Sequence, residues 1–289
     1  MIVSRANKLV LGTVQLGLKY GIANKSGRPN HEESREILKF AMDSGIDTLD
    51  TAQAYGDVHE IISSFHQNSP KKFKIQTKFN SLPYNIVDYL KSQAELLKVP
   101  SIETLYFHSF EDFENCLDFE SFKKAKELGL LNEIGVSIYN TKQLEKCISN
   151  KYIDTIQSPF NLFDNWSERG ALFEKAHSNG KKIYTRSVFL QGLFFLKKEE
   201  LKGVLKKMED CIEKVQQLSK EKQLSIQDLA LNYCLSFEQV SGVLVGVDTK
   251  GQLEQNLKAM DVSLEKQTIE QINGLKVNYP ELLNPVNWE

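Results

Sequence analysis

Four side chains capable of acid–base chemistry occur in the first half of the chain: Asp50, Tyr55, Lys78 and His108. Three of them end short apolar segments, since Asp50 closes IDTLD, Lys78 closes IQTK and His108 closes LYFH. Tyr55 follows in the loop D-T-A-Q-A-Y-G. If these segments are consecutive parallel strands, an acid, a cation and an imidazole meet at one rim, with a phenol beside them.

This set suits proton donation to a developing alkoxide. A tyrosine phenol has an ordinary pKa near 10 and is a poor acid at neutral pH. A buried ammonium within about 4–6 Å favours the phenolate, so we expect Lys78, held by Asp50, to lower the pKa of Tyr55. His108 would hydrogen-bond the substrate carbonyl. No protein nucleophile is needed if a cofactor supplies hydride.

Each residue also has an ordinary structural interpretation. An aspartate at a strand end is often a cap, a lysine there is often a solvated edge residue, and a histidine is often a satisfied core residue. Taken singly, Lys78 and His108 favour that interpretation. Because all three ionisable residues end consecutive strands on the same side, the structural interpretation needs three coincidences, and we favour the catalytic one.

The elements that would position these residues alternate between strands and helices. Strands are expected at residues 9–14, 46–50, 73–78, 103–108, 133–137, 153–157, 182–185 and 243–246. Helices are expected at 32–44, 58–65, 85–98, 119–128, 141–149, 168–179, roughly 203–222, and 225–235 with Ser225 as N-cap. Gly45, Gly129 and Gly180 stand where left-handed C-caps are usual.

This order predicts an α/β protein: a closed parallel (β/α)₈ TIM barrel in a single domain over residues 1–289. Such a barrel typically needs about 250 residues, so the length fits. The structural alternative is a doubly wound open sheet. No G-x-G-x-x-G follows the first strand, which counts against that alternative.

Composition excludes several classes of protein. The chain is 41% hydrophobic and 26% charged, which is ordinary for a globular protein and argues against disorder. A net charge of −2 favours neither nucleic acid nor an anionic membrane as partner. No apolar run reaches about 18 residues, and the N-terminal segment lacks a signal-peptide pattern, so we expect a cytoplasmic protein. No pattern sets an oligomeric state.

No metal site or disulfide is expected. The four cysteines stand at irregular intervals without a C-x-x-C. The string HEIISSFH places His59 and His66 seven residues apart, which does not match the H-E-x-x-H spacing of a zinc site.

The four residues and their surroundings resemble the aldo-keto reductase superfamily, including its bacterial members. D-T-A-x-x-Y-G, IQTK and LYFH are similar to the segments that carry the family's catalytic Asp, Tyr, Lys and His. GVSIYN, IDTIQSPFN, RSVFLQGL and GVDTKGQLEQNLKA extend the resemblance over nearly the whole chain. It implies a tetrad in which Tyr55 donates the proton, Lys78 and Asp50 lower its pKa, and His108 orients the substrate.

The resemblance also implies an extended NADP(H) across the barrel mouth, without a Rossmann fold. Strand ends would contact the nicotinamide carboxamide, a loop after the seventh strand the pyrophosphate, and residues 246–256 the adenosine phosphate. The implied contacts are Ser137 and Gln157 for the carboxamide; Ser187, Val188, Leu190 and Gly192 for the pyrophosphate; Gly246, Lys250, Gln252, Gln255 and Asn256 for the adenosine phosphate; and, beside these, Thr13, Asp50 and Arg186.

Three positions depart from the family pattern. Ile138 replaces the Asn that often follows the Ser of GVSN, and Arg186 stands where many members stack an aromatic ring on the nicotinamide. Gln252 stands where many NADP-specific members carry an Arg for the 2′-phosphate. Lys250 is a candidate to compensate, while Asp248 opposes a second negative charge. The resemblance therefore favours NADP(H), with NAD(H) as the alternative.

Aromatic residues after two strands are candidates for the substrate pocket: Tyr20 after the first, and Phe160 and Trp166 after the sixth. Packing against the rim is the alternative for each. The short loop at 109–118 predicts an open pocket for a polar small-molecule carbonyl substrate, such as a sugar-derived aldehyde. The start of the Lys- and Glu-rich stretch 196–222 is a candidate lid over the cofactor.

We therefore expect an NAD(P)H-dependent oxidoreductase that reduces an aldehyde or ketone to an alcohol. A second hypothesis is a dinucleotide-sensing regulatory subunit on the same barrel, against which the intact tetrad counts. A third, isomerase or lyase chemistry, lacks a metal cluster or a Schiff-base context.

Overall fold

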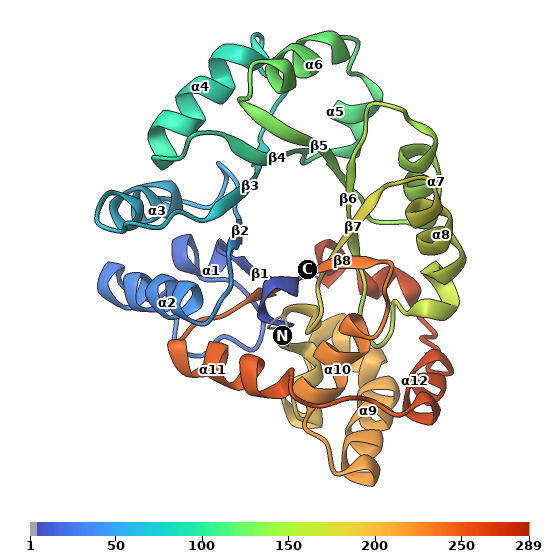
Figure 1. Ribbon diagram of the computed structural model, residues 1–289. Helices are drawn as coiled ribbons and strands as arrows, with labels where there is room; N and C mark the ends of the chain where they lie inside the picture. Colours follow the sequence, from blue (N-terminus) through green and yellow to red (C-terminus); the bar gives the residue numbers. More distant parts are fainter. Residues whose placement is uncertain (1–4, 289) are drawn as a thin grey trace.

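The strands of the computed structural model, which describes residues 5–288, close into a barrel (Figure 1). Each strand is parallel to its neighbours in chain order, and the first pairs with the last. The strands are β1 (Leu9–Gly12), β2 (Thr48–Asp50), β3 (Lys74–Phe79), β4 (Ile102–Phe107), β5 (Leu131–Ser137), β6 (Thr155–Pro159), β7 (Lys182–Arg186) and β8 (Val240–Gly246). The predicted TIM barrel is confirmed.

The helices lie outside the barrel, with α9, α10 and α12 gathered on one side (Figure 1). They are α1 (Val14–Gly17), α2 (His31–Asp43), α3 (Val58–Gln67), α4 (Ile86–Leu97), α5 (Phe110–Glu114), α6 (Phe119–Glu127), α7 (Thr141–Ser149), α8 (Trp166–Ser178), α9 (Glu209–Lys222), α10 (Ile226–Leu235), α11 (Lys250–Ala259) and α12 (Lys266–Asn273). Helices cover the outside of the barrel, and side chains fill its inside. Every residue of β2 and β6 is therefore buried.

Helix-capping signals in the sequence are confirmed. Gly45, Gly129 and Gly180 have φ of 90°, 70° and 71°, the left-handed conformation that a C-cap glycine supplies. Ser225 caps α10 by accepting a hydrogen bond from the backbone N–H of Asp228, whose carboxylate accepts from Ser225 N in return.

Among the segments in which the structure differs from the predicted elements, three follow strand ends. β1 ends at Gly12 rather than at Val14, which opens the short α1. The loop expected after His108 contains α5, which Ser109 caps through its hydroxyl. The segment expected as an adenosine-phosphate loop forms α11, capped by Thr249. Because short capped helices lack a long apolar period, the periodicity missed them.

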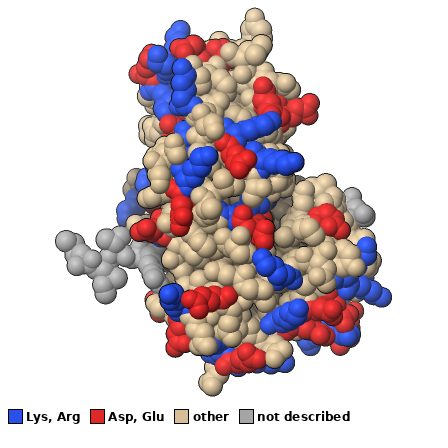
Figure 2. Space-filling model, turned by 90° about the vertical axis from the view of Figure 1, so that its right-hand side faces the viewer, with Lys and Arg blue, Asp and Glu red and all other residues tan. Residues whose placement is uncertain are grey.

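The surface carries charges of both signs. Figure 2 shows Lys and Arg intermingled with Asp and Glu over the face in view. Among residues 5–288, no helix combines the length and apolar character that a membrane-spanning segment requires. All four cysteines are buried and unpaired, and His66 is bonded inside the fold to Leu97 O and Phe73 N.

Candidate active site

The strand register sets the site residues side by side at the carboxyl rim of the barrel. Gly12 pairs with Asp50 across β1 and β2, and Ser137 pairs with Gln157 across β5 and β6. Thr13, just past β1, donates its hydroxyl to Asp50 O at 2.9 Å. Parallel strands deliver their ends to one face, so residues more than 100 positions apart meet there.

Asp50 and Lys78 form an ion pair that is almost fully buried. Lys78 Nζ lies 2.7 Å from each Asp50 carboxylate oxygen and 3.3 Å from Thr51 O. Gln157 Nε2 donates to Asp50 Oδ2 at 2.8 Å. Burial lowers the pKa of Lys78, an effect that Asp50 opposes. These three acceptor atoms hold the Lys78 ammonium in place.

Tyr55 lies half-buried beside this pair, with Lys78 Nζ 5.7 Å from the centre of its ring. Burial, and then the charge of Asp50, raise the pKa of the Tyr55 phenol. The net shift is therefore opposite to the expected one: burial and the charge of Asp50 outweigh any lowering by the Lys78 ammonium, which donates to Asp50 and Thr51. Tyr55 therefore keeps its proton at neutral pH.

The backbone around Tyr55 is held by two glycines in close contact. A Cβ on Gly17, the last residue of α1, would overlap with Tyr55 O. Gly56 has φ of 61°, and a Cβ there would lie 2.6 Å from Gly17 O. Only residues without a side chain permit this approach, which sets where the Tyr55 backbone lies.

His108 is the first residue beyond β4 and is half-buried. Burial, followed by the charge of Lys78, lowers its pKa to about 4. The imidazole is therefore neutral at physiological pH and carries one N–H donor and one acceptor. A neutral imidazole is suited to hydrogen-bonding a carbonyl oxygen.

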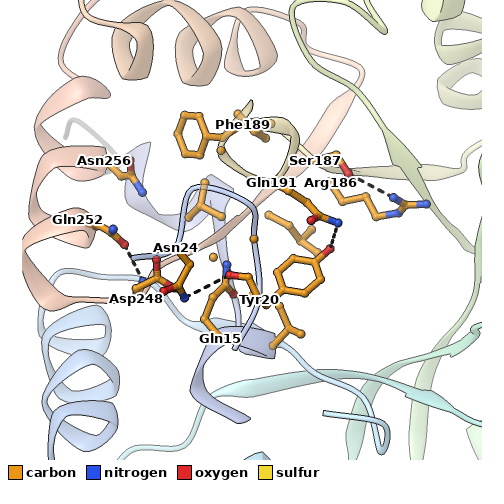
Figure 3. A pocket seen from close by; sticks show the side chains of 18 of the residues that line it. Gln15, Tyr20, Asn24, Arg186, Ser187, Phe189, Gln191, Asp248, Gln252 and Asn256 are labelled. Carbon is orange, nitrogen blue, oxygen red and sulfur yellow. Dashed lines mark hydrogen bonds between the residues drawn. The ribbon is translucent and has the colours of Figure 1, made fainter. Parts of the chain in front are cut away.

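A cavity of about 410 Å³ opens beside these residues (Figure 3), a size typical of small-molecule sites. It is bounded by the loops after β1, β7 and β8 and by α11. The expected site residues that line it are Thr13, Tyr20, Asp50, Tyr55, Gln157, Arg186, Ser187, Val188, Gly192, Gly246, Gln252, Gln255 and Asn256. Lys78, His108, Ser137, Leu190, Lys250, Phe160 and Trp166 do not line it.

Phe160 and Trp166 lie in an aromatic cluster instead of the expected substrate pocket. Phe160 is fully buried, 5.5 Å from the ring of Tyr233. Trp166 stacks on Phe237 at 4.1 Å. The apolar faces of α8 and α10 bury these rings against each other, which removes them from the cavity wall.

Lys250 also lies elsewhere than expected. Its ammonium sits 5.2 Å from the ring of Phe40 on α2 and 4.0 Å from Glu254 Oε1. It begins α11, and its side chain packs on the neighbouring helix rather than on the cavity. Its expected contact with the cofactor stays a prediction, and the structure places the side chain outside the cavity wall.

Arg186 lines the cavity at the end of β7 and is anchored there. Its guanidinium lies 4.5 Å over the ring of Tyr139 and donates to Ile138 O at 3.0 Å and to Ser187 Oγ at 3.3 Å. No carboxylate within residues 5–288 pairs with it. Two of the positions that depart from the family pattern, Ile138 and Arg186, are therefore in contact with each other.

The loop after β7 has the strained backbone of a ligand-binding turn. Ser187, Leu190 and Gln191 have φ of 63°, 44° and 53°, and Gly192 follows at 89°. A Cβ on Gly192 would lie 2.5 Å from the Cβ of Ala23. Left-handed non-glycine residues concentrate at ligand sites. Within this turn the N–H groups of Leu190 and Gly192 donate to Ser187 O and Phe189 O. Amide side chains around the cavity add donors, so the wall fits a nicotinamide dinucleotide.

Several lining residues were missed from the sequence, among them Gln15, Asn24 and Gln191. Gln15 lies in α1 just after β1, Asn24 in the loop that follows α1, and Gln191 in the helical turn after β7. Gln15 Oε1 is buried without a hydrogen-bond partner, and Gln191 Nε2 donates to Tyr20 Oη at 3.1 Å. The signal that could have identified these lining residues is their position shortly after the end of a strand.

Comparison with known proteins decides the family. The model of the Aldo/keto reductase family matches residues 8–277. The chain belongs to the aldo/keto reductase family. Members of this family are oxidoreductases that reduce carbonyl groups with nicotinamide cofactors.

This aldo/keto reductase is similar, at low sequence identity, to two bacterial proteins. It is 21% identical to L-glyceraldehyde 3-phosphate reductase of Escherichia coli O157:H7, with 84% of each chain covered. It is 26% identical to the aldo-keto reductase YhdN of Bacillus subtilis strain 168 over 58% of this chain and 54% of that one.

Solved structures share the fold. The aldo-keto reductase AKR11C1 from Bacillus halodurans superimposes with a TM-score of 0.76 at 19% identity, covering 93% of this chain and 91% of that one. The glycerol dehydrogenase AKR11B4 from Gluconobacter oxydans superimposes with a TM-score of 0.72 at 19% identity, covering 97% and 94%.

Proposed function

We propose that this aldo/keto reductase reduces an aldehyde or ketone to an alcohol with NAD(P)H, and that Tyr55 is its proton donor. The observation that carries the proposal is the buried Asp50–Lys78 pair beside Tyr55, at the mouth of a cavity large enough for a small ligand. Family membership supports a nicotinamide cofactor, and the family's habit favours NADP(H).

The side chains of the site have different roles in proton transfer. When bound, the dinucleotide supplies the hydride for the carbonyl carbon. Tyr55 holds its proton until the carbonyl oxygen gains negative charge, and then donates it. Lys78, 5.7 Å from the ring centre, stabilises the phenolate that remains. Neutral His108 orients the carbonyl oxygen, and Asp50 fixes Lys78.

The cofactor would be held by backbone and amide groups along the cavity. We assign Ser137 and Gln157 to the carboxamide and the strained loop after β7 to the pyrophosphate. Gln157 already donates one amide proton to Asp50, which fixes its orientation at the rim. Asn256, buried on α11 and facing the cavity, is assigned to the adenine.

We assign the substrate to small, polar carbonyl compounds such as sugar-derived aldehydes. The wall near Tyr55 includes the hydroxyl of Tyr20 and the guanidinium of Arg186. The names of the relatives, an L-glyceraldehyde 3-phosphate reductase and a glycerol dehydrogenase, point to hydroxylated three-carbon compounds of this kind.

The test compares two tyrosines of the same cavity. Tyr55→Phe should lower turnover of a reactive aldehyde by about 10²–10⁴-fold, with unchanged cofactor affinity in fluorescence titrations. Tyr20→Phe, which loses only the contact with Gln191, should retain most turnover. Comparable turnover in wild type and Tyr55→Phe would exclude Tyr55 as the acid. Cofactor binding without turnover over a broad aldehyde panel would favour the sensor hypothesis.

A further inference from the structure

Charged residues are rare on the cavity wall and sit at its two ends. The charged lining residues are Asp50, Arg186 and Asp248. Asp50 and Arg186 belong to the catalytic rim, whereas Asp248 lies across the cavity, between β8 and α11 (Figure 3). The charge of Asp50 is balanced by Lys78. Asp248 therefore makes the far end of the cavity negatively charged.

Asp248 is held in place by neutral partners. Its Oδ1 accepts a hydrogen bond from Asn24 Nδ2 at 2.8 Å, and its backbone N–H donates to Gln252 Oε1 at 2.6 Å (Figure 3). Partial burial raises the pKa of the Asp248 carboxyl. A second anion beside this half-buried carboxylate would be repelled.

Three Lys and Arg residues that are near Asn24 or Asp248 in sequence make their contacts outside the cavity. Lys25 pairs with Glu200 at 2.6 Å, and Arg28 pairs with Asp57 and donates to Leu16 O. Lys250 lies over Phe40. None of the three lines the cavity.

A dinucleotide has to reach this end. Tyr55 acts on the carbonyl oxygen, so the hydride-bearing ring must lie near Tyr55, and the rest of an extended molecule must follow the cavity toward β8 and α11. Its adenosine ribose then comes near Asp248. A 2′-phosphate on that ribose adds close to two negative charges, while a free 2′-hydroxyl is a donor that a carboxylate accepts.

We propose that the far end of the cavity selects a dinucleotide with an unphosphorylated adenosine ribose, NAD(H), and that Asp248 is the residue that determines this specificity. The inference rests on the proposed function, because it takes the nicotinamide to lie at Tyr55. In dinucleotide-binding folds of another class, an acidic residue accepts from the ribose 2′-hydroxyl, and an arginine accommodates the 2′-phosphate. Asp248 and Gln252 would reproduce the first arrangement on a barrel.

The experiment is a pair of binding titrations on the whole protein. NADH and NADPH are titrated separately, and their dissociation constants are taken from protein fluorescence or calorimetry without substrate. Wild type should bind NADH at least about tenfold more tightly, a ratio equivalent to about 1.4 kcal/mol. Asp248→Asn should reduce the ratio by about tenfold, mainly by strengthening NADPH binding.

Two further variants keep the test decisive. Gln252→Arg changes an exposed residue and should strengthen NADPH binding by about tenfold, because it supplies a cation for the phosphate. Glu254→Gln removes a carboxylate from the same helix without touching the cavity and should leave the ratio unchanged.

The outcomes separate the two proposals. Equal or tighter binding of NADPH by wild type overturns the inference and leaves the proposed function standing. A preference for NADH that Asp248→Asn does not alter overturns the assignment to Asp248. If neither nucleotide binds, the proposed function itself fails.

Discussion

The two ends of the cavity are built on different principles. At the catalytic end, Asp50 and Lys78 are buried, opposite in charge and bonded to each other as well as to the backbone. At the far end, Asp248 is partly exposed, and among residues 5–288 its hydrogen bonds join neutral groups of Asn24 and Gln252. The first end rests on the barrel strands, and the second on loops and the first turn of α11.

The difference separates what the chemistry requires from what can vary. A change in the buried pair leaves an uncompensated charge in the interior, so few substitutions are tolerated there. At the far end, a substituted side chain is in contact with water and with side chains that can adjust. Substitutions there can therefore change the cofactor preference without loss of the fold. The predictions below test this contrast.

The largest effect is expected when the buried pair is broken. Lys78→Met leaves Asp50 as a buried carboxylate whose remaining side-chain donor among the described residues is Gln157, so the free energy of unfolding should fall by about 3–5 kcal/mol. Turnover should fall by at least about 10²-fold because Tyr55 loses the charge that stabilises its phenolate. Denaturant unfolding and steady-state kinetics measure the two effects.

A matched control lies on the same strand. Lys74 pairs with Asp47 at 2.8 Å, but both side chains are about half exposed. Lys74→Met should lower the free energy of unfolding by at most about 1 kcal/mol and spare turnover. Equal losses from the two variants would contradict the claim that burial gives the catalytic pair its importance.

A smaller effect is expected from His108 and depends on pH. The folded pKa is about 4, while an unfolded histidine titrates near 6.5, so between these values protons bind preferentially to the unfolded chain. The free energy of unfolding should therefore decrease as the pH falls from about 6.5 toward 4. His108→Asn should flatten this decrease, as followed by urea unfolding at several pH values.

The same histidine predicts the acid limb of activity. Because the folded imidazole stays neutral, kcat/KM should not decline near pH 6.5 on its account. His108→Asn should raise KM or lower kcat by about tenfold, while exposed His177→Asn should change neither. A loss of activity centred on pH 6.5 that His108→Asn abolishes would show that His108 titrates normally.

The smallest effect is expected at the far end. Asn24→Ala removes one hydrogen bond to Asp248, which is worth about 0.5–1.5 kcal/mol. NADH binding should weaken by a few-fold, with kcat unchanged. Thermal unfolding of the free protein should shift modestly, since the Asn24 side chain also donates to Tyr20 O and Gly27 O and accepts from Gly27 N. A large loss of kcat would mean that the two ends are coupled.

Sequence reasoning reached the barrel and the positions of the tetrad because both depend on backbone order. Strand ends of a parallel barrel share one face, so Asp50, Lys78 and His108 could be placed at one rim from the strand ends alone. Side-chain direction could not be predicted in the same way. Lys250 turns toward Phe40, and Phe160 turns into the core, because neighbouring helices offer each a better contact than the cavity does.

The direction of the pKa shift at Tyr55 could not be predicted from the sequence either. Proximity to Lys78 predicted a lowered pKa for Tyr55, but the sign depends on where the ammonium protons go and on how deeply the phenol is buried. The bond between Asn24 and Asp248 joins loops 224 positions apart and has no local signal.

The contact of Gly17 with Gly56 bears on how such a protein can lose its activity. A substitution at Gly17 would displace the Tyr55 backbone while all four members of the tetrad remained in place. A search for the tetrad motif would still recognise the resulting chain as an intact reductase. Under the proposed function, the position of the proton donor therefore depends on a residue with no side chain and no chemistry of its own, 38 positions before the tyrosine that it supports.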